Sequence, residues 1–206
     1  MYAVVENNNI TQFINYPKSI VIGEVRYPAK IFTMWSKAEK EAIGIYEIIT
    51  DSTNYKDPAY YINTNEQYTF ANGQVTKSWG TATAKRLEDE NAVDEDDNPV
   101  LQDGVQVINY GLKTEKKRIV KQQASGLLAP TDWYVVKSTE VADYDIPANV
   151  LSFRADVRSK SNEMETQIDN CTTVDELKAL YEYTNTGTEA NPVITRPLAE
   201  FPTLEN

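Results

Sequence analysis

The chemistry open to this chain is narrow, because the residue types that serve most enzymes are missing or nearly so. The sequence contains no histidine and a single cysteine, Cys171. Ser-His-Asp and Cys-His catalysis need an imidazole as the base, and His-based zinc and haem sites need it as a ligand. One thiol also excludes an intrachain disulfide and a thiolate cluster. We therefore expect no enzyme activity, no metal site and no cofactor.

Carboxylates are the abundant reactive group, with 31 acidic residues in 206. A paired-carboxylate glycosidase stays open as an alternative, because it needs only two of them at a fixed separation, although no pair is marked out by its spacing. Residues 88–97 hold seven carboxylates in ten positions. A calcium loop starting at Asp94 would need Gly and Glu where Pro99 and Val105 stand. We interpret the run instead as a solvated linker, extended because its like charges repel.

The charge balance limits the partners. Twenty basic residues against 31 acidic ones give a net charge of -11, which disfavours nucleic acid, because neutralising phosphates needs clustered Lys and Arg. No stretch approaches the ~18 apolar residues of a transmembrane helix, the N-terminus lacks the pattern of a signal peptide, and no glycine-rich nucleotide loop occurs. We expect neither nucleic-acid binding nor membrane insertion.

Aromatic residues are the better candidates for binding. Thirteen Tyr and three Trp outnumber five Phe, and rings with a polar tip suit interfaces. Tyr60 and Tyr61, together with Tyr68, form either a platform for stacking a sugar or half-buried positions of a small sheet. We favour the sheet, because tyrosine has a high propensity for strands.

Five residues are candidates for an interface or for a wedge between two predicted helices: Asp132, Trp133, Tyr134, Arg154 and Arg158. Trp133 and Tyr134 either fill the core where the chain reverses, which we favour, or anchor a partner. Arg154 and Arg158 lie one helical turn apart. They either form a solvated face, or bind a partner's carboxylate, or pair within the chain. The carboxylates within reach for such pairing are Asp132, Asp143 and Asp145.

Local patterns predict a small antiparallel β-rich domain with one short helix over residues 1–87. The β-prone stretches are 2–5, 10–14, 20–25 and 45–49, the first two separated by a run of three asparagines. Ser36 and Glu39 have the spacing of a capping box and predict the start of the helix. Asn72-Gly73 between β-prone arms predicts a type I′ hairpin.

The second half of the chain reads as helical. Residues 88–104 are the expected acidic linker and residues 105–184 the expected helical domain. Its parts are a helix over 106–128, an extended piece over 131–141, a long helix that starts at Pro147, and a short third helix capped by Thr173 and Glu176. Apolar residues recur on one face of the long helix, which predicts an antiparallel helical hairpin. Residues 185–206 are predicted to be an extended Pro-rich tail, so the fold class is α+β.

Four stretches resemble the tail-fibre assembly and minor tail proteins of tailed bacteriophages. They are WSKAEKEAIGIYEI at residues 35–48, TDWYVVKS at 131–138, Ile-Pro followed by SFRADVRSKSNEMET at 152–166, and PLAEFPTLEN at 197–206. The resemblance covers about half of the chain and touches both of its halves. None of these motifs is catalytic, so it carries no site residue across.

The resemblance implies a non-enzymatic structural component of the virion, located in the phage tail and made in the host cytoplasm. Such a protein would be associated with the fibre or baseplate, would dock onto other tail proteins and would form a homo-oligomer. Two alternatives stay open at this point. One is an assembly chaperone that binds the tip of the fibre, and the other is a receptor module that binds a host glycan through its Tyr-rich sheet.

Overall fold

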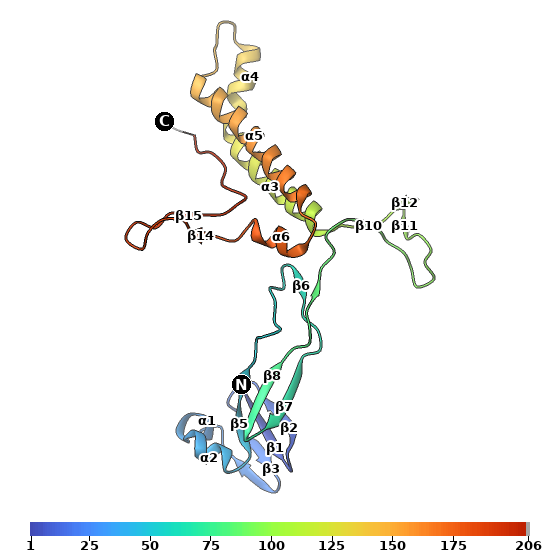
Figure 1. The fold of residues 1–206 in the computed structure, drawn as a ribbon, viewed down its shortest axis with the longest axis vertical. Coiled ribbons are helices and arrows are strands. Elements are labelled where there is room, and N and C mark those ends of the chain that lie inside the picture. The colour runs from blue at the N-terminus through green and yellow to red at the C-terminus, as the bar shows by residue number, and fades with distance from the viewer. Residues whose placement is uncertain (205–206) are drawn as a thin grey trace. The chain divides into compact units, whose positions relative to one another are not determined.

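The computed structural model describes residues 1–204 and shows an α+β protein built from two compact units. The first unit comprises residues 1–84 and the second begins at Lys85. Figure 1 draws the chain with most of its helices and strands labelled. The division falls at Ala84, so the predicted 88–104 linker lies wholly inside the second unit.

A five-stranded sheet forms the centre of the first unit. Its strands follow the order β2-β1-β5-β8-β7. Their bounds are Tyr2–Glu6 for β1, Asn9–Ile14 for β2, Ile45–Thr50 for β5, Gln67–Ala71 for β7 and Gln74–Ser78 for β8. β5 and β8 pair in parallel, so the expectation of a purely antiparallel sheet was wrong. β7 begins at the end of the sheet where β5 stops and runs back in the opposite direction, so β8, the return strand of the β7–β8 hairpin, runs alongside β5 in the same direction.

The tight turns of the sheet occur at the predicted asparagines. Asn7 and Asn8 have φ angles of 51° and 63°, and Asn72 and Gly73 have 52° and 72°. Asparagine and glycine accept this left-handed conformation more easily than other residues. The β1–β2 and β7–β8 hairpins are thereby confirmed.

Short elements cover one face of the sheet. β3 (Ile20–Ile22) and β4 (Val25–Tyr27) form a hairpin that turns at Gly23, where φ is 59°. The single strand predicted over 20–25 was therefore wrong. α1 (Ile31–Met34) was not predicted, whereas α2 (Lys37–Glu41) starts at the expected capping box. These elements bury an apolar cluster against the sheet, consisting of Val4, Ile14, Ile20, Ile31, Phe32 and Ile45.

The two edge strands of the sheet curl toward each other. The Phe13 ring on β2 lies 4.5 Å from the Tyr68 ring on β7, measured between centroids. Ala3, Val5 and Val75 are buried on the concave face that this curvature creates. The unit is completed by two short paired strands, β6 (Tyr61–Ile62) and β9 (Thr83–Ala84).

The second unit opens with a β-arm, which we define as residues 90–109. Two strand pairs build it: β10 (Glu90–Asn91) with β13 (Ile108–Asn109), and β11 (Leu101–Gln102) with β12 (Val105–Gln106). The expectation of an extended linker was therefore wrong. The side-chain amide of Gln106 donates hydrogen bonds to three carbonyls of the arm, which hold it folded despite its charge.

Helices follow the arm in the second unit (Figure 1). They are α3 (Leu112–Leu128), the 3-10 turn η1 (Ala129–Thr131), α4 (Asp132–Glu140), α5 (Ala148–Asn170) and α6 (Val174–Ala179). α3 starts later than the predicted residue 106, because residues 108–109 are paired in β13. The predicted extended piece over 131–141 is instead the helix α4. The capping box of Thr173 and Glu176 is confirmed.

α3 and α5 pack side by side and run in opposite directions. Lys117 pairs with Asp169 at 2.6 Å and Lys121 with Glu165 at 3.2 Å, so later residues of α3 meet earlier residues of α5. The predicted apolar face of α5 is buried throughout: Val150, Phe153, Val157, Met164 and Ile168. No helix within residues 1–204 is both long and apolar enough to cross a membrane.

The C-terminal segment is more structured than an extended tail. β14 (Thr184–Asn185) pairs with β15 (Ile194–Thr195), so residues 184–195 form a small hairpin. Beyond it, Leu198 is buried and Phe201 packs against the cluster of Ala124, Phe153 and Val157. The last two residues of the PLAEFPTLEN stretch lie outside the described residues.

Candidate functional site

A buried arginine organises the start of α4. The guanidinium of Arg154, on α5, donates through Nη1 to the carbonyl of Leu128 at 3.1 Å, to Oγ1 of Thr131 at 2.5 Å and to the carboxylate of Asp132 at 2.8 Å. Its side chain is only 9% exposed, whereas that of Asp132 is 60% exposed. A planar guanidinium can satisfy several acceptors at once. Arg154 thus ties the end of α3 and the beginning of α4 to α5.

Trp133 and Tyr134 stand on this anchored turn. Their rings stack with centroids 3.8 Å apart and an interplanar angle of 30°. Trp133 is 50% exposed, and Tyr134 is half-buried. The expectation that Trp133 fills the core was wrong. The chain forms a helix here instead of the predicted extended piece, and the helix turns the indole outward.

The exposed apolar side chains of α4 continue beyond Trp133. Val136 lies three positions further along, which places it on the same side of the helix, and it is 52% exposed. Val135 and Val141 are also exposed, with Val135, two positions from Trp133, on a different side of the helix. We call these four residues the α4 surface: Trp133, Val135, Val136 and Val141. The ammonium of Lys137 lies 4.1 Å from the centroid of the Tyr144 ring, so the loop after α4 is held against the helix.

The five candidate residues have different roles in the structure: Trp133 and Tyr134 form the stacked pair on α4, and the other three make polar contacts. Arg154 and Asp132 form an ion pair, one of the pairings that their positions allowed. Arg158 is exposed, and its guanidinium donates to the carbonyl of Arg154 at 3.2 Å. Val135, Val136 and Val141 were not singled out from the sequence. Recognising α4 as a helix would have revealed Val136, because a spacing of three positions in a helix places it beside Trp133.

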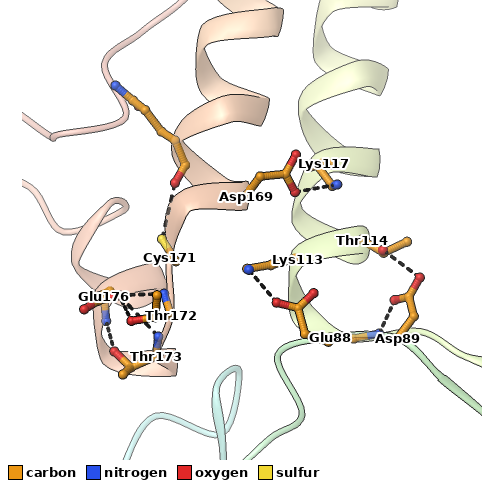
Figure 2. Close-up of polar contacts among 12 residues, drawn as sticks. Glu88, Asp89, Lys113, Thr114, Lys117, Asp169, Cys171, Thr172, Thr173 and Glu176 are labelled. Carbon is orange, nitrogen blue, oxygen red and sulfur yellow. Dashed lines mark hydrogen bonds and ion pairs between the residues drawn. The ribbon is translucent and has the colours of Figure 1, made fainter.

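The opposite end of the α3–α5 pair is a polar joint (Figure 2). The carboxylate of Asp89 accepts hydrogen bonds from the backbone N–H of Gly111 at 2.7 Å and from the Thr114 hydroxyl at 3.0 Å. Glu88 pairs with Lys113 at 2.5 Å. These contacts fix the root of the β-arm to the first turn of α3. An acidic side chain there also complements the positive end of the helix dipole.

The remaining contacts in Figure 2 perturb three titratable groups. The backbone N–H and the hydroxyl of Thr172 hydrogen-bond the Glu176 carboxylate and lower its pKa. The hydrogen bond to Asp169 raises the pKa of Lys117. Burial raises the pKa of the Cys171 thiol. Glu176 belongs to the capping box at the start of α6, Lys117 pairs with Asp169 near the end of α5, and Cys171 is the residue that ends α5. All three groups therefore have structural roles at helix ends or between helices.

The tyrosines proposed as a sugar platform do not line one open surface. Tyr60 and Tyr61 are each 5% exposed. Tyr68 is partly covered by Phe13, and its hydroxyl donates to Glu66 at 2.8 Å. Stacking of a sugar requires an accessible ring face, so these three residues serve as packing residues of the first unit, the interpretation that their strand propensity favoured.

Comparison with protein-family models, with curated proteins and with solved structures finds no match to this chain. Within residues 1–204, no group of three or more Cys, Asp or Glu side chains is placed to hold a metal ion. The geometry that stands out is the α4 surface: exposed apolar side chains on a short helix whose start is fixed by a buried arginine.

Proposed function

We propose that this protein is a non-enzymatic structural component of a phage tail, associated with the fibre or baseplate, that acts by docking onto other tail proteins. The resemblance of four sequence stretches to tail-fibre assembly and minor tail proteins supports the setting. The α4 surface supports the mode of action. The observation that carries the proposal is a tryptophan left 50% exposed on a helix with a fixed start.

Leaving apolar side chains such as the Trp133 indole in water costs free energy that burial in an interface would recover. Tryptophan is the residue most enriched among interface hot spots, and hot spots work best when they are held rigidly before binding. Arg154 supplies the rigidity through its three hydrogen bonds. A stable contact buries about 800 Å² on each partner, so the α4 surface would be the centre of a larger interface.

Quantitative peptide mass spectrometry on purified virions tests the setting, with the major capsid protein as the reference. A fixed copy number per particle is the expected result, and a multiple of three or six would match fibre or baseplate symmetry. A protein that is abundant in the lysate but absent from virions would overturn the structural role and favour a fibre-assembly chaperone.

A substitution at Trp133 tests the docking surface. Trp133→Ser should change the free energy of unfolding by less than about 1 kcal/mol, because the indole is half in water, while incorporation into virions should fall at least tenfold. Phe153→Ala, in the buried cluster, should cost about 3–5 kcal/mol. Chemical denaturation and virion mass spectrometry give the two measurements.

Tyr16→Ser is the matched control, because Tyr16 is a 67% exposed aromatic residue in the first unit. It should leave both stability and incorporation unchanged. Incorporation of Trp133→Ser at the normal level would contradict the role of the α4 surface. A loss of stability as large as that of Phe153→Ala would show that the indole is a core residue.

A further inference from the structure

The β-arm carries apolar side chains on its outside. Leu101 is 58% exposed and Val105 is 69% exposed on the pair of strands near its tip. Val93 forms a single antiparallel bridge with Pro99, and Val100 follows that bridge in the chain. Val93 is 51% exposed and Val100 is 37% exposed. Four exposed aliphatic residues thus fall within 13 positions of the chain, and a local concentration of exposed apolar side chains is typical of interaction surfaces.

The arm is nevertheless folded. Backbone hydrogen bonds join Ala92 to Val107 at 2.8 Å, Val100 to Ala92 at 2.9 Å and Val107 to Val100 at 2.9 Å. The side chain of Gln106 adds hydrogen bonds of 2.8 and 2.9 Å to the carbonyls of Ala92 and Val107. A segment that is ordered before it binds loses less conformational entropy on association. The exposed aliphatic residues are thus presented in a preformed arrangement.

The charge of the arm specifies the surface that it would fit. Residues 88–111 contain no Lys or Arg. Within the described chain, no basic side chain forms an ion pair with the five carboxylates beyond the root of the arm, which are Asp94, Glu95, Asp96, Asp97 and Asp103. A complementary surface would have apolar character and a positive charge.

The α3 groove meets the charge requirement, and Tyr110 adds an aromatic ring to its otherwise polar and charged lining residues. It is a depression of about 700 Å³ along the outer side of α3, and Tyr110, Lys117, Arg118, Lys121 and Gln122 are among the residues that line it. α3 carries five Lys or Arg and one Glu. The side chains of Arg118 and Lys121 are 58% and 66% exposed. Their intrachain pairs are on the surface, where ion pairs are weak and exchange easily.

The root of the arm is fixed to the first turn of its own α3. Gly111 joins the two, and a Cβ atom there would lie 2.4 Å from the backbone of Glu88. Asp89 and Glu88 bind the first turn of α3 on either side of this junction (Figure 2). The residues that line the groove are Tyr110 and members of α3, and none belongs to the 90–109 arm of the same molecule. The groove is therefore open to the arm of another molecule.

We propose that the β-arm of one copy docks in the α3 groove of a second copy. The contact is heterologous, because each copy offers an arm and a groove that are different surfaces. Heterologous contacts close into a ring when the rotation between copies allows it. The proposal rests on the β-arm and α3 alone and does not depend on the α4 surface or on a place in a phage tail.

Complementation between two variants of the full chain tests the contact. Leu101→Ser with Val105→Ser inactivates the arm, and Arg118→Glu with Lys121→Glu inactivates the groove. Light scattering after size-exclusion chromatography, at about 1–100 µM protein, should show oligomers for the unmodified chain and monomers for each double variant. A 1:1 mixture of the two variants retains one intact arm and one intact groove, so it should give heterodimers and nothing larger.

Two controls separate this contact from other routes to assembly. Val25→Ser with Lys37→Glu changes one 53% exposed valine and one exposed lysine in the first unit, and it should leave the oligomer intact. Trp133→Ser should leave it intact as well, which separates the arm contact from the α4 surface. Raising NaCl from about 50 to 500 mM should weaken association at least tenfold, because the contact pairs opposite charges.

Three results would overturn the proposal. The unmodified chain would be monomeric at every concentration, or a double variant would remain oligomeric, or the mixture of the two variants would stay monomeric. Disruption by Trp133→Ser alone would assign self-association to the α4 surface instead, and the arm proposal would fail while docking through α4 survived.

Discussion

At the scale of single residues, Arg154 connects three helical elements to α5, because its guanidinium binds the end of α3, η1 and the start of α4. It is a charged side chain inside the helical unit, and its cost of burial is offset because the carbonyl of Leu128, the hydroxyl of Thr131 and the carboxylate of Asp132 all accept from it. Spacing within the chain was enough to suggest a partner carboxylate. The other two acceptors could not be predicted, because they depend on where η1 turns.

Replacing Arg154 should therefore cost more than replacing its neighbour one turn away. Arg154→Ala removes the donor to the Thr131 hydroxyl and to the Asp132 carboxylate, while the Leu128 carbonyl keeps its hydrogen bond from Thr131. The substitution should lower the free energy of unfolding by about 1–3 kcal/mol. Arg158→Ala removes an exposed side chain and should stay within about 0.5 kcal/mol. Urea denaturation measures the free energy of unfolding of both variants. Equal losses of stability would contradict the anchoring role of Arg154.

Glu176 gives a residue-scale prediction about pH. Its pKa is lowered by the hydrogen bonds from Thr172, so the folded carboxylate binds its proton less readily than the unfolded one. The stability that it contributes is complete above the unfolded pKa and is lost as the pH falls through the folded pKa. Thr172→Val removes the hydroxyl donor and keeps the backbone N–H, so it should raise the pKa of Glu176.

NMR titration of the Glu176 carboxyl carbon measures this shift. The same titration followed on the Glu39 carboxyl is the internal control, since Ser36 lowers the pKa of that group in a separate capping box and Thr172→Val does not touch it. An unchanged midpoint for Glu176 in Thr172→Val would show that the hydroxyl contributes nothing.

At the scale of elements, local sequence predicted what local contacts decide. Both capping boxes and the Asn72-Gly73 turn are formed by residues within three positions of one another, and the structure has all of them. α4 was missed because its aromatic and β-branched residues favour strands in isolation. Its helix starts where Arg154 fixes the preceding turn, and that contact comes from 22 residues away in sequence.

The β-arm was missed for a related reason. A run of carboxylates indicates repulsion and an extended chain, and nothing within the run argues otherwise. The bonds that fold it come from its C-terminal half, where Gln106 reaches back to Ala92 across 14 positions. Pairing between short strands of this kind has little periodicity to detect, so the second unit was predicted to start too late.

Gly111, just before α3, and Gly126, inside α3, together test the tight contact at the root of the arm. Gly111→Ala would place a Cβ atom 2.4 Å from the Glu88 backbone and should destabilise the protein by about 1–3 kcal/mol. Gly126→Ala, inside α3 with open space around it, should stabilise by about 0.5–1 kcal/mol. Thermal unfolding compares them, and the same sign for both would contradict the tight junction.

At the scale of the whole molecule, the chain is two units, each with its own buried cluster. Each is large enough to fold alone. We expect the fragments 1–84 and 85–206, made separately, to unfold cooperatively on heating, as followed by circular dichroism. A fragment that is unfolded by itself would show that its unit depends on the other. The expectation of an acidic linker at 88–104 predicts instead that deleting residues 88–97 leaves both units folded.

The position of Cys171 makes the joint between α5 and α6 observable in time. The thiol is the only one in the chain, is buried at the end of α5, and has a raised pKa. A thiol-reactive dye can therefore label the native protein only when this joint opens, and no engineered label is needed. At a saturating dye concentration, the rate of labelling equals the rate at which the region around Cys171 opens, so it measures local unfolding between α5 and α6.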